Sequence, residues 1–125
     1  MTQPSARGAD IVGMLSFQKL DVYQCAVQFF ALSTRLATRL PRGQSALAEQ
    51  LRRAALSVPL NIAEAAGRTS EADAARHYAI ARGSAMECAA VADALLVLAS
   101  VEPAEHAQAI ELLGRIVSML TRLCR

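Results

Sequence analysis

Apolar residues recur at intervals of three and four along most of this chain, which is the period of an amphipathic helix. Proline and glycine interrupt the pattern at only three places, residues 40–43, residues 67–70 and Pro103. The pattern therefore predicts four helices, over residues 17–40, 45–66, 71–99 and 103–123. The short turns between them favour an antiparallel up-and-down four-helix bundle, so the expected fold class is all-α.

The second predicted helix contains Pro59, which lacks a backbone N–H and would cost roughly 3 kcal/mol inside a helix. Its apolar stripe nevertheless keeps its phase across the proline, through Leu47, Leu51, Ala54, Val58, Ile62 and Ala65. We therefore expect a kinked but continuous helix. The side chains of Ser57 and Asn61 could bond to the backbone groups that the proline frees.

The third predicted helix has a seam of mainly small residues, at Tyr78, Ala81, Ala85, Cys88, Ala92, Leu95 and Ala99. Small side chains in such a seam let helix axes approach closely. Ser70 and Asp73 resemble a capping box at its start, and Gly67 is a candidate C-cap for the helix before it. Pro103 suits the first position of the fourth helix, where a missing N–H is no loss.

The first and fourth predicted helices have more apolar surface than one core requires. The first has one stripe through Val22, Ala26, Phe29, Leu32, Leu36 and Leu40, and a second through Leu20, Tyr23, Val27, Phe30, Thr34 and Ala37. The fourth has stripes through Ile110, Leu113, Val117 and Leu120, and through Leu112, Ile116, Met119 and Leu123. Monomeric proteins rarely expose large contiguous apolar patches, so we expect a homo-oligomer, either a closed ring or a symmetric dimer. The alternative is a monomer with scattered surface leucines.

Composition narrows the possible classes of protein. Apolar residues make up 54% of the 125 positions, but aromatics only 4%, which favours helices over sheets. The longest uncharged stretch, residues 22–34, is shorter than the roughly 20 residues of a membrane-spanning helix. Residues 1–14 are expected to form a flexible lead-in without signal-peptide features, and residues 15–125 a single bundle domain. The three widely spaced cysteines are expected to be reduced thiols, so we expect a cytoplasmic protein that contacts no membrane.

The second predicted helix also has a polar stripe with helical spacing, at Gln50, Arg53, Ser57, Asn61, Glu64 and Arg68. An antiparallel third helix could bring Arg76, Gly83, Ser84 and Glu87 alongside it, and Gly83 would permit close backbone approach. One interpretation is a hydrogen-bond network that holds the two helices, or a neighbouring subunit, in place. The other is a polar site for RNA or a small ligand.

Three runs of sequence resemble one known family, the 23S rRNA intervening-sequence proteins. They are FQKLDVY at residues 17–23, QLRRAALSVPLNIAEAAGR at 50–68 and IARGSAME at 80–87. Ala65 departs from the family pattern, which usually has glycine there. The resemblance implies a four-helix bundle that assembles into five-membered rings and has no assigned catalytic activity. Related accessory proteins of diversity-generating retroelements bind nucleic acid and a reverse transcriptase.

The distribution of charge leaves a role in nucleic-acid binding open. The net charge is only +2, but residues 35–82 carry eight arginines against four acidic residues. Arginine pairs with phosphate in a bidentate manner, and the candidate phosphate contacts are Arg42, Arg52, Arg53, Arg68 and Arg76. Solvated arginines, or arginines at a protein interface, would explain the same pattern. The charge also lies well below that of a dedicated nucleic-acid binder.

Catalytic and metal-binding patterns are lacking. His77 and His106 fall on different helices without ligand spacing, and we expect His77 to be half-exposed. No glycine-rich phosphate loop occurs. Glu64 and Glu87 could form a pair of carboxylates, but the sequence shows no pocket for a substrate beside them. Glu64 is instead expected to form ion pairs with Arg53 and Arg68. The sequence thus predicts a non-enzymatic, cofactor-free, homo-oligomeric scaffold or interaction protein. The alternative is an RNA- or DNA-binding accessory factor that uses arginines on the oligomer surface.

Overall fold

The computed structural model describes residues 15–125, and within that range it contains helices and no strand. The four α-helices are α1 (Asp21–Arg39), α2 (Ser45–Ala66), α3 (Glu71–Val97) and α4 (Pro103–Leu123). Two short 3₁₀ helices, η1 (Ser16–Lys19) and η2 (Arg42–Gln44), precede α1 and α2. For these described residues, the prediction of four α-helices without a strand is confirmed. The predicted lead-in at residues 1–14 lies outside the described residues.

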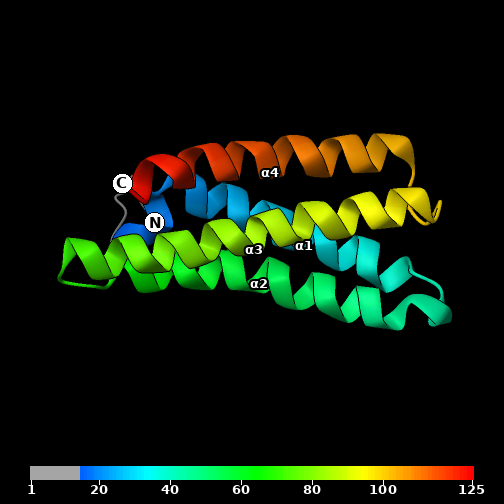
Figure 1. Cartoon of the computed structure of the whole chain (residues 1–125), viewed down its shortest axis with the longest axis horizontal. Coiled ribbons are helices and arrows are strands. Elements are labelled where there is room, and N and C mark those ends of the chain that lie inside the picture. The colour runs from blue at the N-terminus through cyan, green and yellow to red at the C-terminus, as the bar shows by residue number, and fades with distance from the viewer. Residues whose placement is uncertain (1–14) are drawn as a thin grey trace, which may run out of the picture.

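The four helices lie side by side along the long axis of the molecule (Figure 1). Helix α1 packs against α2 and α4, and α3 packs against the same two helices. In Figure 1 the colour sequence runs in opposite directions along successive helices, so the α2–α3 turn and the end of α4 lie at one end of the bundle. The α1–α2 and α3–α4 connections lie at the other end.

One side of each helix forms the common core. Helix α1 buries its first predicted stripe from Val22 to Leu36, and α2 buries its single stripe from Leu51 to Ala65. The remaining members of these two stripes, Leu40 and Leu47, are half-buried. The small-residue seam of α3 is buried from Ala81 to Leu95, but Tyr78 is only half-buried and Ala99 lies exposed beyond the end of the helix. The second predicted stripe of α1 is only partly exposed: Val27 is 42% exposed and Thr34 also faces solvent. Leu20, Tyr23 and Phe30 are half-buried against the core, and Ala37 is buried.

Several helix ends differ from the predictions. Helix α1 starts at Asp21 rather than at residue 17, because the residues before it form η1. Ser70 caps α3 by accepting a hydrogen bond from the Asp73 backbone N–H at 3.0 Å, but the carboxylate of Asp73 bonds to Arg76 instead of completing the capping box. Gly67 caps α2 with right-handed backbone angles.

The end of α3 is closed by a residue in an unfavourable conformation. Ala99 has a φ of 57°, which places a residue with a Cβ in the left-handed region. The N–H of Ser100 donates to the carbonyl of Leu95 at 2.9 Å, and that of Ala99 to Leu96 at 3.0 Å. These two bonds define a Schellman motif, in which glycine usually takes the left-handed position.

Helix α2 is continuous through Pro59, as the phase of its apolar stripe predicted. Pro59 itself is buried, and its missing N–H leaves the carbonyl of Ala55 without the usual helical partner. The side chain of Asn61 donates to the carbonyl of Ser57 rather than to that of Ala55. Within the described residues, neither Ser57 nor Asn61 bonds through its side chain to the carbonyl of Ala55, so this prediction is wrong.

Candidate functional site

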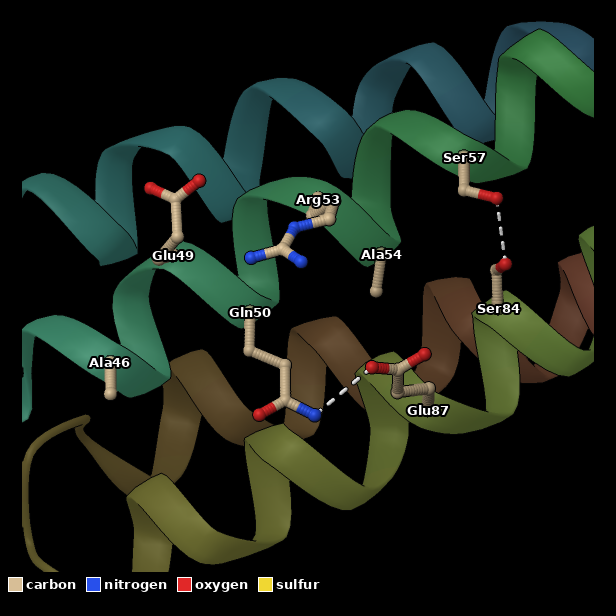
Figure 2. Close-up of a pocket in the computed structure, with 8 residues that line it drawn as sticks. All are labelled: Ala46, Glu49, Gln50, Arg53, Ala54, Ser57, Ser84 and Glu87. Carbon is tan, nitrogen blue, oxygen red and sulfur yellow. Dashed lines mark hydrogen bonds between the residues drawn. The ribbon is translucent and has the colours of Figure 1, made fainter.

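The polar residues of α2 meet those of α3 along the outer seam between the two helices. At its centre the hydroxyl of Ser57 lies 2.8 Å from that of Ser84. Figure 2 shows these two side chains pointing toward one another from α2 and α3. The Asn61 amide, one turn further along α2, donates to the carbonyl of Ser57 at 2.9 Å and to its hydroxyl at 3.1 Å. With one hydrogen bond already received, the Ser57 hydroxyl is free to donate its own hydrogen to Ser84.

The same chain of bonds continues to His77 on α3. The backbone carbonyl of Ser57 can only accept, so the NH₂ group of Asn61 must face it and Oδ1 must face His77, whose Nδ1 lies 3.3 Å away. His77 therefore donates from Nδ1. Its Nε2 lies 3.2 Å from Nη2 of Arg76, which can only donate, so in the neutral ring Nε2 accepts.

His77 corrects one prediction from the sequence, because it is buried at 8% exposure rather than half-exposed. It lies four residues before Ala81, so it continues the buried seam of α3 by one helical turn. That spacing was the signal that could have placed it in the interior.

A cluster of charged side chains ends the network at the α2–α3 turn. Arg68 pairs with Glu64 at 2.6 Å and, more loosely, with Asp73 at 3.6 Å, while Arg76 pairs with Asp73 at 3.0 Å. The hydrogen bond from Arg76 is the main reason that the pKa of the Asp73 carboxyl lies below its ordinary value. The predicted pair of Glu64 with Arg68 is thus present. Arg53 makes no such pair with Glu64 within residues 15–125.

Beyond the serine pair, the two helices enclose an open groove of about 550 Å³ (Figure 2). The amide of Gln50 on α2 donates to the carboxylate of Glu87 on α3 at 3.1 Å, across this groove. Figure 2 shows the Arg53 side chain beside those of Glu49 and Gln50 on the α2 wall. The lining residues are Ala46, Glu49, Gln50, Arg53, Ala54, Ser57, Ser84 and Glu87.

The structure thus brings together all but one of the residues that the polar stripe singled out. The exception is Gly83, which is exposed, and a Cβ built there would meet nothing within 4 Å. The expectation that Gly83 permits close backbone approach is therefore wrong. Glu64 and Glu87 line different grooves, since Glu64 borders a second one formed by Leu60, Asn61, Ala63, Glu64, Gly67 and Arg68. The two carboxylates do not form a pair.

The five candidate arginines do not form one continuous basic surface. Arg42 lies in η2, at the opposite end of the bundle from Arg68 and Arg76. Arg68 and Arg76 are both paired with carboxylates. Arg52 is half-buried and Arg53 exposed, and neither makes an ion pair or a side-chain hydrogen bond within the described range.

Other kinds of site find little support in residues 15–125. No group of three or more metal-ligating side chains comes together there. In that same part of the chain, no helix combines the length and the hydrophobicity that a membrane span requires. Cys25 and Cys88 are buried, Cys124 is partly exposed, and all three are free thiols; burial raises the pKa of Cys88 to about 12.

The fold and the polar seam define a class of small four-helix protein in which the polar side chains between two helices bond mainly to one another. Residues 18–122 match the family described as 23S rRNA-intervening sequence protein, and the chain belongs to this family. The resemblance seen in the sequence is confirmed.

A solved structure from Bacteroides thetaiotaomicron has a similar fold. It is described as a protein with unknown function from the S23 ribosomal protein family. The two chains superpose with a TM-score of 0.78 at 21% identity, over 83% of this chain and 98% of the other. At this identity the likeness shows the fold alone. No curated protein matches the chain significantly.

Proposed function

We propose that this protein is a non-enzymatic, homo-oligomeric scaffold or interaction protein, built on an up-and-down four-helix bundle and working in the cytoplasm without a cofactor. The opposite courses of successive helices in Figure 1 support the up-and-down topology. The three free thiols agree with a reducing compartment. Family resemblance suggests five copies in the assembly.

The observation that carries the proposal is the amount of apolar surface on a single protomer. Ten large apolar side chains of the described residues are each 36% exposed or more. They are spread over the four helices, but Leu56 and Leu60 lie one turn apart on α2, and Leu96, Val97 and Leu98 follow one another at the end of α3. Contiguous exposed apolar side chains usually mark a contact with another protein. By contrast, the polar residues between α2 and α3 bond largely to one another, as expected of groups that hold two helices together.

Multi-angle light scattering at micromolar concentration tests the proposal directly. We expect a single species with a mass several times the 13.3 kDa of the protomer. A mass of 13.3 kDa with no larger species would refute homo-oligomerisation. Dilution into the nanomolar range then gives the strength of the assembly, since the apparent stability of an oligomer depends on protomer concentration.

A second candidate, binding of RNA or DNA, is favoured by one specific observation. Arg42, Arg52 and Arg53 make no ion pair within the described range, so their guanidinium groups are available to phosphates. If the oligomer binds RNA, affinity should fall steeply with salt, and the double variant Arg52→Glu/Arg53→Glu should lose binding while remaining assembled. Arg115→Glu, at an exposed arginine in the other half of the chain, is the matched control. Absence of binding at low salt excludes this candidate.

A further inference from the structure

The groove between α2 and α3 has small side chains at the base of its α2 wall. Its volume is about 550 Å³, within the range of about 300–1,000 Å³ that small-molecule sites occupy. Ala46 and Ala54 line it, where longer apolar side chains would fill the space. Ala54 is only 5% exposed and therefore lies deep in the groove, next to the core. The groove thus offers both room and some apolar surface to a small molecule.

The hydrogen-bond network of the polar seam ends in this groove with a donor. The hydroxyl of Ser57 donates to that of Ser84, because it already accepts from Asn61. Ser84 keeps its own hydrogen, for which residues 15–125 provide no acceptor within hydrogen-bonding distance. A serine hydroxyl has one hydrogen to donate, so Ser84 offers it to an occupant of the groove.

The guanidinium group of Arg53 adds a charged donor to the same stretch of the groove. Arg53 lies four residues before Ser57, so the two share one side of α2. Glu49 lies four residues before Arg53, a spacing at which opposite charges can pair, yet Arg53 makes no ion pair within the described range. A guanidinium group binds a carboxylate through two parallel hydrogen bonds. This stretch of the groove therefore suits a carboxylate.

Acceptors lie one turn further along the α3 wall. Glu87 follows Ser84 by three residues, and its carboxylate receives one described hydrogen bond, from Nε2 of Gln50 at 3.1 Å (Figure 2). A carboxylate has about four lone-pair positions, so most of its capacity is unused, and Oε1 of Gln50 is a further acceptor beside it. An ammonium group has donors only. These oxygens therefore suit an ammonium group.

We propose that the groove between α2 and α3 binds a small zwitterion, a neutral α-amino acid. Its carboxylate lies against Arg53 and Ser84, its ammonium group against Glu87, and its side chain over the alanines of the α2 wall. Ser84 and Glu87 are separated by about one helical turn, roughly 5 Å along α3. The two charged groups of an α-amino acid share one carbon atom, so they can contact both residues. A ligand of this kind goes beyond the proposed scaffold role and does not depend on it.

The mixed charge of the lining favours a zwitterion over a simple ion or a nucleic acid. Two carboxylates, Glu49 and Glu87, and one guanidinium group, that of Arg53, line the groove. A phosphate would meet both carboxylates, and a simple cation would meet the arginine. Arg52, the neighbouring basic residue, does not line the groove. A neutral amino acid instead brings one charge of each sign to a group of the opposite sign.

Saturation-transfer difference NMR on the full-length protein tests the site, with L-alanine, L-valine and L-leucine as probes. Because Arg53 and Glu87 are exposed, solvent screens both contacts, and we expect dissociation constants in the millimolar range. Isocaproate and isoamylamine match leucine in shape but carry only the carboxylate or only the ammonium group. Each should bind about tenfold more weakly than leucine, since it leaves one charged contact unmade.

Two variants locate the ligand. Arg53→Met and Glu87→Gln each remove one charge at a similar side-chain length, and each should weaken the binding of L-leucine about tenfold. Arg35→Met and Glu111→Gln, at exposed positions of α1 and α4, are the matched controls and should bind as the wild type does. All four replace exposed side chains, so circular dichroism should be unchanged. If a variant does not fold, the probe series on the wild type decides the question.

Three results would overturn the proposal. The first is the absence of binding of all three amino acids to the wild type at millimolar concentration. The second is unchanged binding of leucine in either Arg53→Met or Glu87→Gln, which would place the ligand elsewhere. The third is binding of isocaproate or inorganic phosphate as tight as that of leucine, which would show an anion site instead. The mass of the assembly is measured separately, so none of these results bears on the proposed homo-oligomer.

Discussion

Replacing Asn61 by leucine tests whether the polar seam between α2 and α3 is a structural network. In the wild type, Oδ1 of Asn61 accepts from Nδ1 of His77 at 3.3 Å, and its amide donates to Ser57. Leucine is similar in size to asparagine but removes all three bonds. The hydroxyl of Ser57 keeps Ser84 as a partner, whereas Nδ1 of His77, on a side chain only 8% exposed, loses the one acceptor described for it.

The expected loss of stability follows from that orphaned donor. A buried polar group left without a partner costs about 1–3 kcal/mol, so Asn61→Leu should lower the free energy of unfolding by about that amount. For a domain of this size, 1 kcal/mol corresponds to a shift of roughly 4 °C or more in melting temperature. The double variant Asn61→Leu/His77→Leu removes both partners and should recover part of the loss, since the two residues are coupled by about 0.5 kcal/mol or more.

The assay is urea unfolding followed by circular dichroism at 222 nm. It compares the wild type, the single variants Asn61→Leu and His77→Leu, and the double variant at equal protomer concentration. Equal concentration is essential because assembly adds to apparent stability. Gln108→Leu, at an exposed position of α4, is a control for adding a leucine to a helix. If Asn61→Leu changed the stability by less than about 0.5 kcal/mol at an unchanged slope, the network would not be stabilising and the argument from hydrogen bonding would be wrong.

Three further predictions rest on other features of the chain. Ala99→Gly should raise the free energy of unfolding by about 1 kcal/mol in thermal or urea unfolding, because glycine adopts the left-handed backbone without the penalty of a Cβ; a loss of stability would contradict the Schellman assignment. The pKa of Asp73 is lowered in the folded protein, so its pair with Arg76 stabilises the fold at pH values above 3.8, the ordinary pKa of the carboxyl group. This stabilisation is lost as the pH falls through the lower pKa of the folded state. Melting temperature should therefore drop less between pH 7 and pH 3 in Asp73→Asn than in wild type, and equal drops would exclude this contribution. Of the three thiols, Cys124 alone should react rapidly with Ellman's reagent in the folded protein. Cys88 is buried and has a pKa of about 12, so it should react only after denaturation. Rapid reaction of Cys88 in the folded protein would contradict its burial.

The balance between structural and binding roles differs along the α2–α3 seam. From Ser84 to His77 every polar group has a partner within hydrogen-bonding distance, which is what a structural network requires. Toward the start of α2 the groove opens, and the guanidinium of Arg53 has no partner within the described range. Variants at Asn61 should therefore affect stability first, while variants at Arg53 should affect binding, if nucleic acid binds.

The amino-acid sequence by itself determined the elements and much of the polar seam. Apolar spacing and helix breakers predicted α2 and α4 with the bounds they have, because proline and glycine stop helices through local backbone geometry. The spacing of Gln50, Ser57 and Asn61 placed these side chains on one face of α2, since helical periodicity is also a local property. The family followed from the same residues.

Only the tertiary structure decided which neighbours these side chains meet. Whether Gly83 lies at a contact and whether His77 is buried both depend on the rotation of α3 against α2. The same holds for the second stripe of α1, whose exposure is set by where α2 and α4 pack. Periodicity fixes the angle between residues on one helix, but the angle between two helices is set by the packing of many side chains at once, and no single segment of sequence contains it.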